Sequence, residues 1–345
     1  MSSEAHASPD ALRAPDALRA LYVNLTENTY NDVCGYNIPR CTKYEDLPYE
    51  YIEPHILGTG GYGKVSVYKR KYKDNREDRE DREDRSYCSD CSVPQELFCI
   101  KEIKLTDNIL SNKDEICKII KEYYILHHIA CENPYVLCFI ECVLNLEYIW
   151  LITTYESGTI DLHDHTVKNG NILTSSEIID ICDKLIKGLI FLHSKGIYHL
   201  DIKPENIIYN SNTKTVKYID FGLSCIKSHK CLPGGSFKYR PPEIMFFYYA
   251  KDVYFIQNGQ QHPIIYKNAS YNKCDIYSLG VTLYFLIFKN HPRNIIDESF
   301  YIIYGQIKIL PYEKDLESLV NIILRMINMK PANRPSLDII KETIK

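Results

Sequence analysis

The sequence predicts an α+β fold of two lobes: a small, sheet-rich lobe and a larger, mainly helical lobe. The chain has 345 residues, which is enough for about two domains or lobes. Strand-like alternation of apolar residues is concentrated between residues 51 and 154, whereas helical periodicity dominates after residue 174. Hydrophobic residues make up 45% and charged residues 25% of the chain, which is typical of a folded protein.

Four segments account for the strand-rich lobe, residues 51–155. Residues 51–71 alternate apolar positions around a glycine cluster and predict two strands joined by a tight turn. Residues 97–103 and 148–154 predict two further strands. Residues 113–129 predict a helix, because apolar side chains recur there at helical spacing.

The larger lobe, residues 156–345, begins with a helix whose start is marked in the sequence. Thr174 and Glu177 have the spacing of a capping box, and an apolar stripe follows them. Residues 275–289 and 316–330 also predict helices. The order of strands first and helices later therefore favours two lobes of different composition.

Three segments fit neither lobe. Residues 1–50 predict a low-complexity N-terminal extension, since residues 9–20 repeat Pro-Asp-Ala-Leu-Arg-Ala twice. An insertion at about residues 72–96 contains an Arg-Glu-Asp run without apolar positions, which predicts a solvated loop. A second insertion, about residues 246–268, is rich in Tyr, Phe and Gln. Each insertion is either a surface loop, because loop-closure entropy grows slowly with length, or a docking site for a partner.

Charge and targeting signals exclude several classes of protein. The 41 Lys and Arg against 45 Asp and Glu give a net charge of −4, which leaves no footprint for nucleic acid or an anionic membrane. Residues 1–20 lack the apolar run of a secretory signal. The longest apolar stretch, residues 279–288, is shorter than the roughly 20 residues of a membrane span and predicts a buried helix. We therefore expect a cytoplasmic protein whose 13 cysteines are reduced.

Residues 58–65 form a glycine cluster, Gly-Thr-Gly-Gly-Tyr-Gly-Lys-Val. This pattern alone fits either a nucleotide-binding loop or a glycine-rich hairpin. A dinucleotide-binding fold would continue into a helix, but here the extended segment 64–68 follows. In a strand–loop–strand hairpin, backbone amides can lie over phosphate groups without obstruction by side chains.

Lys101 lies within an apolar strand, where an ammonium group without a partner would be costly to bury. It is either on the exposed face of an edge strand or a phosphate-binding lysine with an acidic partner. Glu122, on the helix predicted for residues 113–129, is the candidate partner.

Polar residues are densest in residues 199–208, His-Leu-Asp-Ile-Lys-Pro-Glu-Asn-Ile-Ile. Residues 220–222 are Asp-Phe-Gly, and residues 235–243 run from Gly-Ser to Pro-Pro-Glu. With the glycine cluster and Lys101, these segments resemble the signature set of eukaryotic-type serine/threonine protein kinases, in the order that the family has them. The resemblance covers residues 51–345. It implies the bilobal protein-kinase-like fold, with a small lobe built on an antiparallel sheet with one key helix and a larger, mainly helical lobe. The abundance of Ile, Tyr, Asn and Lys is similar to that in large DNA viruses, which would place the protein in host cytoplasm.

The resemblance implies ATP as a cofactor and protein substrates as acceptors. Asp201 would be the catalytic base that accepts the proton of the substrate hydroxyl. Lys203 would contact the γ-phosphate. Lys101 would contact the α- and β-phosphates and pair with Glu122.

The resemblance also implies Mg²⁺ and a preference for serine and threonine. Asn206 and Asp220 would bind the ion through oxygen atoms, which suit this hard cation. Lys203 and Ser236 stand where serine/threonine kinases have residues close to the acceptor hydroxyl. They favour Ser and Thr over Tyr as acceptors.

The nucleotide would lie between the glycine cluster and an apolar pocket. By resemblance, the contacting residues are Leu57, Gly58, Thr59, Gly60, Gly61, Tyr62, Gly63, Lys64, Val65, Cys99, Lys101, Thr153, Tyr155 and Ile208. Cys99 replaces the alanine that is usual in the family. Thr153 is expected at the back of the pocket, and Tyr155 in the hinge.

Leu200 departs from the family pattern, because many kinases have an arginine at this place that receives the phosphate of the activation loop. The segment between Gly222 and Pro241 is also short. We therefore expect activity that does not depend on phosphorylation of Ser224 or Ser228.

Three residues are expected to act as scaffold. Glu243 and Arg334 would form an ion pair in the larger lobe, and Asp275 would hold the catalytic loop through backbone hydrogen bonds.

Other functions on the same fold are a pseudokinase, a kinase of small molecules, and a scaffold module that acts through its insertions. Loss of Lys101, Asp201, Asn206 or Asp220 would indicate a pseudokinase, and all four are present. Lys203 and the segment 235–243 argue for a polypeptide acceptor over a small molecule.

Overall fold

The chain folds into two units in the computed structural model. The first unit lies within Met1–Glu132 and Leu137–Glu156, and the second within Asn133–Val136 and Ser157–Lys345. The structure describes residues 41–47, 49–60, 63–72, 97–129, 132–168, 173–227, 234–249, 254–257, 260–263, 270–292, 307 and 309–344. Outside these ranges lie residues 1–40 of the predicted extension, residues 73–96 of the first insertion, much of the second insertion, and Gly61, Tyr62 and Ser228.

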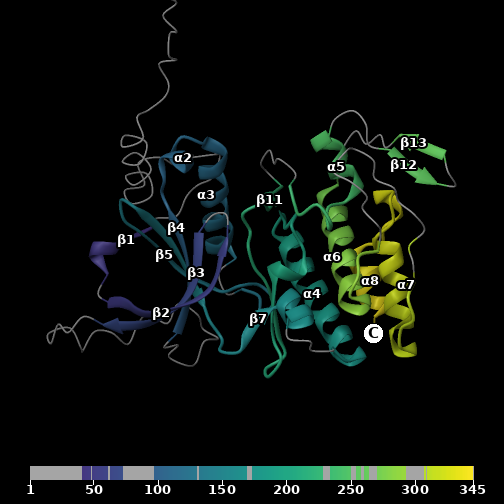
Figure 1. Cartoon of the computed structure of the whole chain (residues 1–345), viewed down its shortest axis with the longest axis horizontal. Helices are drawn as coiled ribbons and strands as arrows, with labels where there is room; N and C mark the ends of the chain where they lie inside the picture. The colour runs from purple at the N-terminus through teal and green to yellow at the C-terminus, as the bar shows by residue number, and fades with distance from the viewer. Residues whose placement is uncertain are drawn as a thin grey trace, which may run out of the picture. The chain divides into compact units, whose positions relative to one another are not determined.

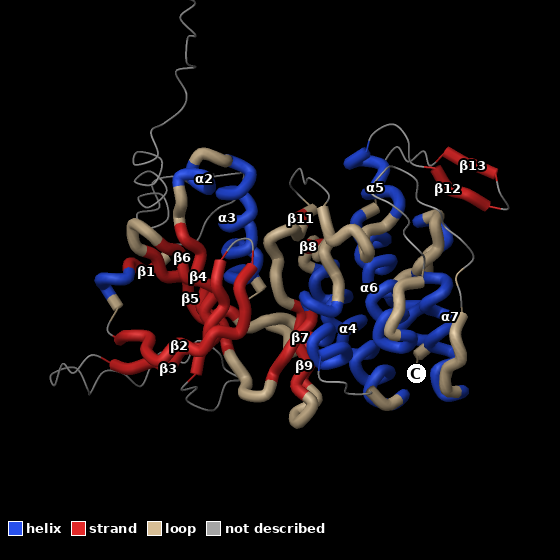
Figure 2. Tube along the Cα trace, in the orientation of Figure 1, coloured by secondary structure: helices blue, strands red, loops and turns tan. Residues whose placement is uncertain are grey.

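A six-stranded sheet forms the first unit (Figures 1 and 2). Its strands are β1 (Thr42–Lys43), β2 (Tyr49–Gly60), β3 (Gly63–Tyr72), β4 (Leu97–Lys104), β5 (Phe139–Leu144) and β6 (Tyr148–Thr154). They lie in the order β1-β5-β6-β4-β3-β2, and every pairing is antiparallel except that of β1 with β5. The strands predicted at 51–71, 97–103 and 148–154 are confirmed.

The end of the predicted extension takes part in this sheet. Residues 42–43 form β1, and a short 3-10 helix, η1 (Tyr44–Asp46), follows. Leu47 is buried, with 3% of its surface exposed, so this segment packs on the sheet. The sequence alone places these residues in the extension, because such short elements have no detectable periodicity.

The helix predicted at 113–129 is α3 (Lys113–His128), preceded by the single-turn α2 (Asp107–Leu110). Asn112 caps α3: its side-chain Oδ1 accepts hydrogen bonds from the backbone amides of Asp114 and Glu115 at 3.1 and 3.4 Å. The ring of Tyr123 lies 5.8 Å from that of Phe139, so α3 packs on β5 through aromatic contact. This packing positions Glu122, the residue that precedes Tyr123 in the helix.

Helices make up most of the second unit (Figure 2). They are α4 (Ser175–Ser194), α5 (Pro242–Tyr249), α6 (Tyr271–Phe288), α7 (Glu317–Met326) and α8 (Leu337–Thr343), with the π-helix η2 (Asp164–Lys168) and the 3-10 helices η3 (Pro204–Asn206), η4 (Lys314–Leu316) and η5 (Pro331–Asn333). The capping box of Thr174 and Glu177 is present at the start of α4. Nearly all of α6 is buried, as its apolar sequence predicts.

Short strands complete the second unit. A three-stranded sheet has the order β10-β9-β7, with β7 (Thr159–Asp161), β9 (Ile207–Asn210) and β10 (Thr215–Tyr218). Strands β8 (Ile197–Tyr198) and β11 (Cys225–Ile226) pair with each other, as do β12 (Tyr254–Gln257) and β13 (Gln260–Pro263) in the second insertion. Strands β8, β9, β10 and β11 therefore bracket the polar segments 199–208 and 220–222.

Cysteine chemistry departs from the sequence expectation. Cys117, Cys138 and Cys225 are disulfide-bonded, whereas Cys41, Cys99, Cys142, Cys182 and Cys274 are free thiols. The expectation of reduced cysteines throughout is wrong at those three positions, because spacing along the chain does not reveal which sulfur atoms meet in space.

Among the described helices, none has the length and apolar character needed to cross a membrane.

Candidate active site

The glycine cluster lies in the hairpin between β2 and β3. Gly60 pairs with Gly63 across the turn, and Gly58 pairs with Val65. A Cβ atom at Gly63 would lie 2.0 Å from the carbonyl oxygen of Glu102, so no other residue fits there without backbone movement. The cluster therefore forms a strand–turn–strand hairpin, the arrangement that distinguishes a phosphate-covering loop from a dinucleotide-binding loop.

Lys101 and Glu122 form the ion pair that is expected from the sequence. The Nζ of Lys101 lies 2.7 Å from both carboxylate oxygens of Glu122. Glu122 is 5% exposed, and such a buried carboxylate needs a partner of opposite charge. The positive charge of Lys101 in β4 is thus balanced by the carboxylate of Glu122 on α3. The cap and the core contacts of α3 hold Glu122 in place.

Sheet register brings four of the predicted nucleotide residues to one face. Val65 is directly opposite Lys101, and Cys99 is directly opposite Thr153. Because residues two apart in a strand share a face, these four side chains lie on the same side of the sheet. Lys64 pairs with Glu102 and lies on the other side, so the structure separates it from this group.

Two residues of the predicted apolar pocket are joined by a hydrogen bond. The hydroxyl of Thr153 donates to the main-chain carbonyl of Cys99 over 3.2 Å. Burial raises the pKa of the Cys99 thiol to about 11, so it is neutral near pH 7. Leu57 is 46% exposed at the start of the hairpin, and Tyr155, just after β6, is partly buried.

In the second unit, Asp201 lies at the centre of a hydrogen-bonded group. Its Oδ1 accepts from the backbone amide of Ser236 at 2.6 Å. Its Oδ2 accepts from the Nδ2 of Asn206 at 2.9 Å and lies 3.2 Å from the Nζ of Lys203. The carboxylate is therefore oriented by three donors, two of them from within five residues of it.

Lys203 connects this group to the segment 235–243. Its Nζ donates to the hydroxyl of Ser236 over 2.7 Å. Gly235 has a left-handed φ of 107°, and a Cβ atom there would lie 2.5 Å from the carbonyl oxygen of Leu200. Glycine thus permits the close approach that brings Ser236 to Asp201.

The sequence pattern of the protein kinase domain matches residues 88–344, more than half of the chain. The chain belongs to the protein kinase family. The glycine hairpin precedes the matched range, so its assignment depends on the sequence motif and on the β2–β3 hairpin.

Individual kinases show the same relationship. Serine/threonine-protein kinase Tao of Drosophila melanogaster is 26% identical over 272 residues, which cover 77% of this chain and 24% of Tao. A kinase homologue of Acanthamoeba polyphaga mimivirus is 27% identical over 251 residues, 70% of this chain and 83% of the viral protein. Serine/threonine-protein kinase PSK1 of Saccharomyces cerevisiae is 32% identical over 185 residues, 53% of this chain and 12% of PSK1. The chain spans about a quarter of the length of Tao and less of PSK1.

Two residues of this kinase have left-handed backbone conformations within the polar segments 199–208 and 220–222. Leu200 and Asp220 each have a φ of 61°. Such conformations are unfavourable for residues other than glycine and are concentrated at functional sites. Asp220 is exposed, and the backbone amide of Gly222 donates to its Oδ1 at 3.4 Å.

The backbone at Leu200 is held by Asp275, as expected. The carboxylate of Asp275 accepts from the amides of His199 at 2.9 Å and Leu200 at 2.7 Å. His193 is a third partner, with its Nε2 2.8 Å from the Oδ2 of Asp275, and the sequence motifs do not point to it. Its only signal in the sequence is its place in the last turn of α4. A histidine is favourable at the C-terminal end of any helix because of the helix dipole, so this place does not indicate a contact with Asp275.

The side chain of Leu200 is in the core. It is 5% exposed and packs with Cys225, Ile244 and Cys274. An apolar residue in this position offers no donor for a phosphate group. The buried, apolar side chain of Leu200 therefore cannot take the place of the phosphate-binding arginine that many kinases have here.

Glu243 and Arg334 form the expected scaffold pair. Both side chains are fully buried, with two contacts between guanidinium and carboxylate at 2.5 and 2.8 Å. Arg334 also donates to the carbonyl oxygens of Asn328 and Lys273 at 2.8 and 2.9 Å. This pair links α5 to the segment before α8.

Proposed function

We propose that this protein kinase transfers the γ-phosphate of ATP to serine and threonine hydroxyls of protein substrates. The observation that carries the proposal is the fixed carboxylate of Asp201, which accepts hydrogen bonds from Ser236 and Asn206 and lies beside Lys203. Phosphoryl transfer needs little covalent chemistry from the protein, so a positioned base and positioned charges are its main requirements.

Asp201 would accept the proton of the attacking hydroxyl. A general base has to be held within hydrogen-bond reach of its substrate, and the three donors around Asp201 restrict the orientation of its carboxylate. Lys203 would neutralise charge on the transferred phosphate. Its hydrogen bond to Ser236 supports a role for both residues at the acceptor hydroxyl.

Lys101 would bind the phosphates of the nucleotide. Glu122 holds its ammonium group by two contacts of 2.7 Å, which preorganises the charge. The glycine hairpin, with Gly58, Gly60 and Gly63, would present backbone amides to the same phosphates. Val65, Cys99 and Thr153 share the face of Lys101 and would contact the base. Ile208 of β9 is assigned to the base by the family resemblance alone.

Asn206 and Asp220 fit an Mg²⁺ ion chemically. Asn206 uses its Nδ2 to donate to the main-chain carbonyl and the carboxylate of Asp201, which leaves its Oδ1 as an acceptor. The carboxylate of Asp220 is exposed and could supply a second oxygen ligand to the ion. Oxygen ligands of this kind are those that Mg²⁺ prefers, and the bound ion neutralises phosphate charge.

The choice of acceptor rests on Lys203 and Ser236 and on the relatives. Tao and PSK1 are both named serine/threonine-protein kinases. We extend that activity to this chain. We also propose that the kinase domain spans residues 51–345, that the protein is cytoplasmic, and that the insertions dock a partner.

Purified chain, ATP and Mg²⁺ with a mixed peptide library test the proposal. We expect phosphoserine and phosphothreonine products. Asp201→Asn should lower the rate by about 100-fold or more, since general base catalysis contributes roughly 10²–10⁴-fold. Asp183→Asn, a surface carboxylate on α4 paired with Lys187, is the matched control and should be active. Absence of transfer to Ser or Thr, or full activity of Asp201→Asn, would contradict the proposal.

A further inference from the structure

The two faces of the sheet in the first unit have different chemistry. Lys101 and Glu102 are neighbours in β4 and therefore lie on opposite faces. Lys101 shares its face with Val65, whereas Glu102 is directly opposite Trp150 of β6. The face that carries Glu102, here called the outer face, takes no part in the proposed catalysis.

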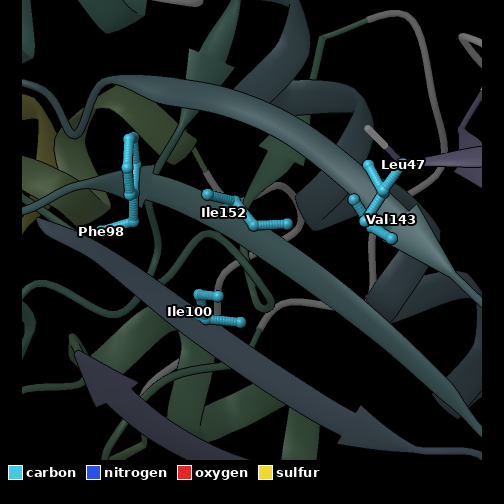
Figure 3. Close-up of a cluster of buried hydrophobic side chains, with 5 residues drawn as sticks. All are labelled: Leu47, Phe98, Ile100, Val143 and Ile152. Carbon is cyan, nitrogen blue, oxygen red and sulfur yellow. The ribbon is translucent and has the colours of Figure 1, made fainter. Parts of the chain in front are cut away.

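An apolar cluster forms the floor of the outer face. It consists of Leu47, Phe98, Ile100, Val143 and Ile152, drawn from the segment after η1 and from three strands (Figure 3). Each of these side chains is at most 5% exposed. In Figure 3, Leu47 lies against Val143 at one end of the cluster and Phe98 marks the other end.

A cavity of about 130 Å³ opens above this floor. Its wall has three aromatic side chains, Tyr44, Tyr68 and Trp150, and one carboxylate, Glu102. The rings of Tyr44 and Trp150 have centroids 5.0 Å apart and are tilted by 47°. Aromatic faces carry partial negative charge, so the wall combines several weak attractions for a cation with one strong one.

The charge of Glu102 is directed into this pocket. The indole Nε1 of Trp150 donates to its Oε2 over 2.9 Å, which fixes the carboxylate beside the ring. In the described part of the chain, no lysine or arginine forms an ion pair with Glu102. Burial and the charge of Glu102 both raise the pKa of Tyr68, which agrees with a carboxylate that faces the same space.

The outer face already holds one arginine by the same combination of groups. The guanidinium carbon of Arg70 lies 4.2 Å from the centre of the Phe98 ring. Its Nη2 lies 2.9 Å from the Oε1 of Glu141. An aromatic ring and a carboxylate of this sheet thus both contact a guanidinium group at this position.

We propose that the pocket of Tyr44, Tyr68, Trp150 and Glu102 binds the guanidinium group of an arginine side chain on a partner protein. A guanidinium is planar, stacks on aromatic rings and donates to carboxylates through a fork, which matches this wall better than a compact ammonium does. Tyr44 is 43% exposed, so the pocket is open to solvent. This site is a docking site on the kinase and does not depend on phosphoryl transfer.

Trp150 supplies a direct readout, because it is the single tryptophan of the chain. The full chain is titrated with N-acetyl-arginine amide in the absence of ATP, and the emission of Trp150 is followed. N-acetyl-citrulline amide has nearly the same shape without the charge and serves as the matched ligand. We expect a saturable change with the arginine probe and a much smaller one with citrulline.

Variants assign the response to the pocket. Glu102→Gln should weaken binding of the arginine probe by about tenfold, as expected for loss of a charge-assisted hydrogen bond. Glu147→Gln, an exposed carboxylate in the turn before β6, should bind as the wild type does. Tyr44→Leu removes one ring at the exposed rim and should also weaken binding, which keeps the test available if Glu102→Gln does not fold.

Three results would overturn the proposal. One is the absence of a saturable change with the arginine probe, and another is an equal response to the citrulline probe. The third concerns the source of the arginine. If the arginine probe binds only after Arg13 and Arg19 are replaced by alanine, the pocket is assigned to the chain's own N-terminal segment instead of a partner.

Discussion

The side-chain amide of Asn206 donates to both the main-chain carbonyl oxygen and the carboxylate Oδ2 of Asp201, each over 2.9 Å. One residue thereby orients the proposed base and keeps its own carbonyl oxygen available for a cation. The two proposed roles of Asn206, as a metal ligand and as a positioning residue, follow from one amide group.

Asn206→Asp should therefore be strongly impaired. The substitution replaces the donor with a second carboxylate that repels Asp201, and misplacement of a catalytic group by about 1 Å can lower a rate on the order of 100-fold. Steady-state kinetics at saturating ATP would measure the change in kcat. Asn212→Asp, on an exposed turn of the same unit, is the matched control. Equal activity of the two variants would contradict the role of Asn206.

Glu122→Gln tests the ion pair with Lys101. Without the carboxylate, the ammonium group is no longer held in one position, and we expect the KM for ATP to rise by about tenfold. The control is Glu115→Gln on the same helix, whose carboxylate pairs with Lys118 at 2.7 Å near the surface. An unchanged KM for ATP in Glu122→Gln would show that Lys101 needs no partner.

Arg334→Met tests the buried scaffold pair. The variant leaves the Glu243 carboxylate buried without its partner, which costs about 3–5 kcal/mol in the free energy of unfolding. Chemical denaturation would measure the loss. The double variant with Glu243→Leu should recover part of it, because two apolar residues leave no uncompensated charge. A double variant less stable than Arg334→Met would be inconsistent with this explanation.

Cys99 should react slowly with alkylating reagents near pH 7.5. Burial raises the pKa of its thiol from about 9 to about 11, so the reactive thiolate is about 100-fold rarer than for an exposed cysteine. The rate should rise with pH up to about 11. Mass spectrometry after iodoacetamide treatment, with the denatured chain as control, measures it. Rapid labelling of Cys99 at pH 7.5 would refute the prediction.

The double variant Ser224→Ala, Ser228→Ala should be about as active as the wild type. The hydroxyl of Ser224 is buried and donates to the carbonyl oxygen of His199 at 3.1 Å, so it is inaccessible to another kinase. Its loss should cost about 1 kcal/mol of stability and leave catalysis intact. Initial rates with peptide and ATP provide the comparison. A loss as large as that of Asp201→Asn would show that phosphorylation of this segment is required.

Elements with strong local signals were predictable from the sequence. The strand at 148–154 has the predicted limits, and the capping box of α4 is made by the two predicted residues. Helix α7 ends at Met326, four residues before the predicted end at 330, and the 3-10 helix η5 begins at Pro331. Strand β1 was not predicted, since a two-residue strand is defined by its partner β5 and not by its own pattern.

The sequence by itself determined which groups are present for chemistry: the glycines, Lys101, Asp201, Asn206 and Asp220, in the order of the kinase family. These signals are local, because each motif is a short run with its own backbone requirements. Tertiary structure alone decided which groups meet. The amide of Ser236 reaches Asp201, and the indole of Trp150 reaches Glu102 48 positions away. Such contacts depend on sheet register and loop path, which many distant residues set together, so no short segment of sequence encodes them.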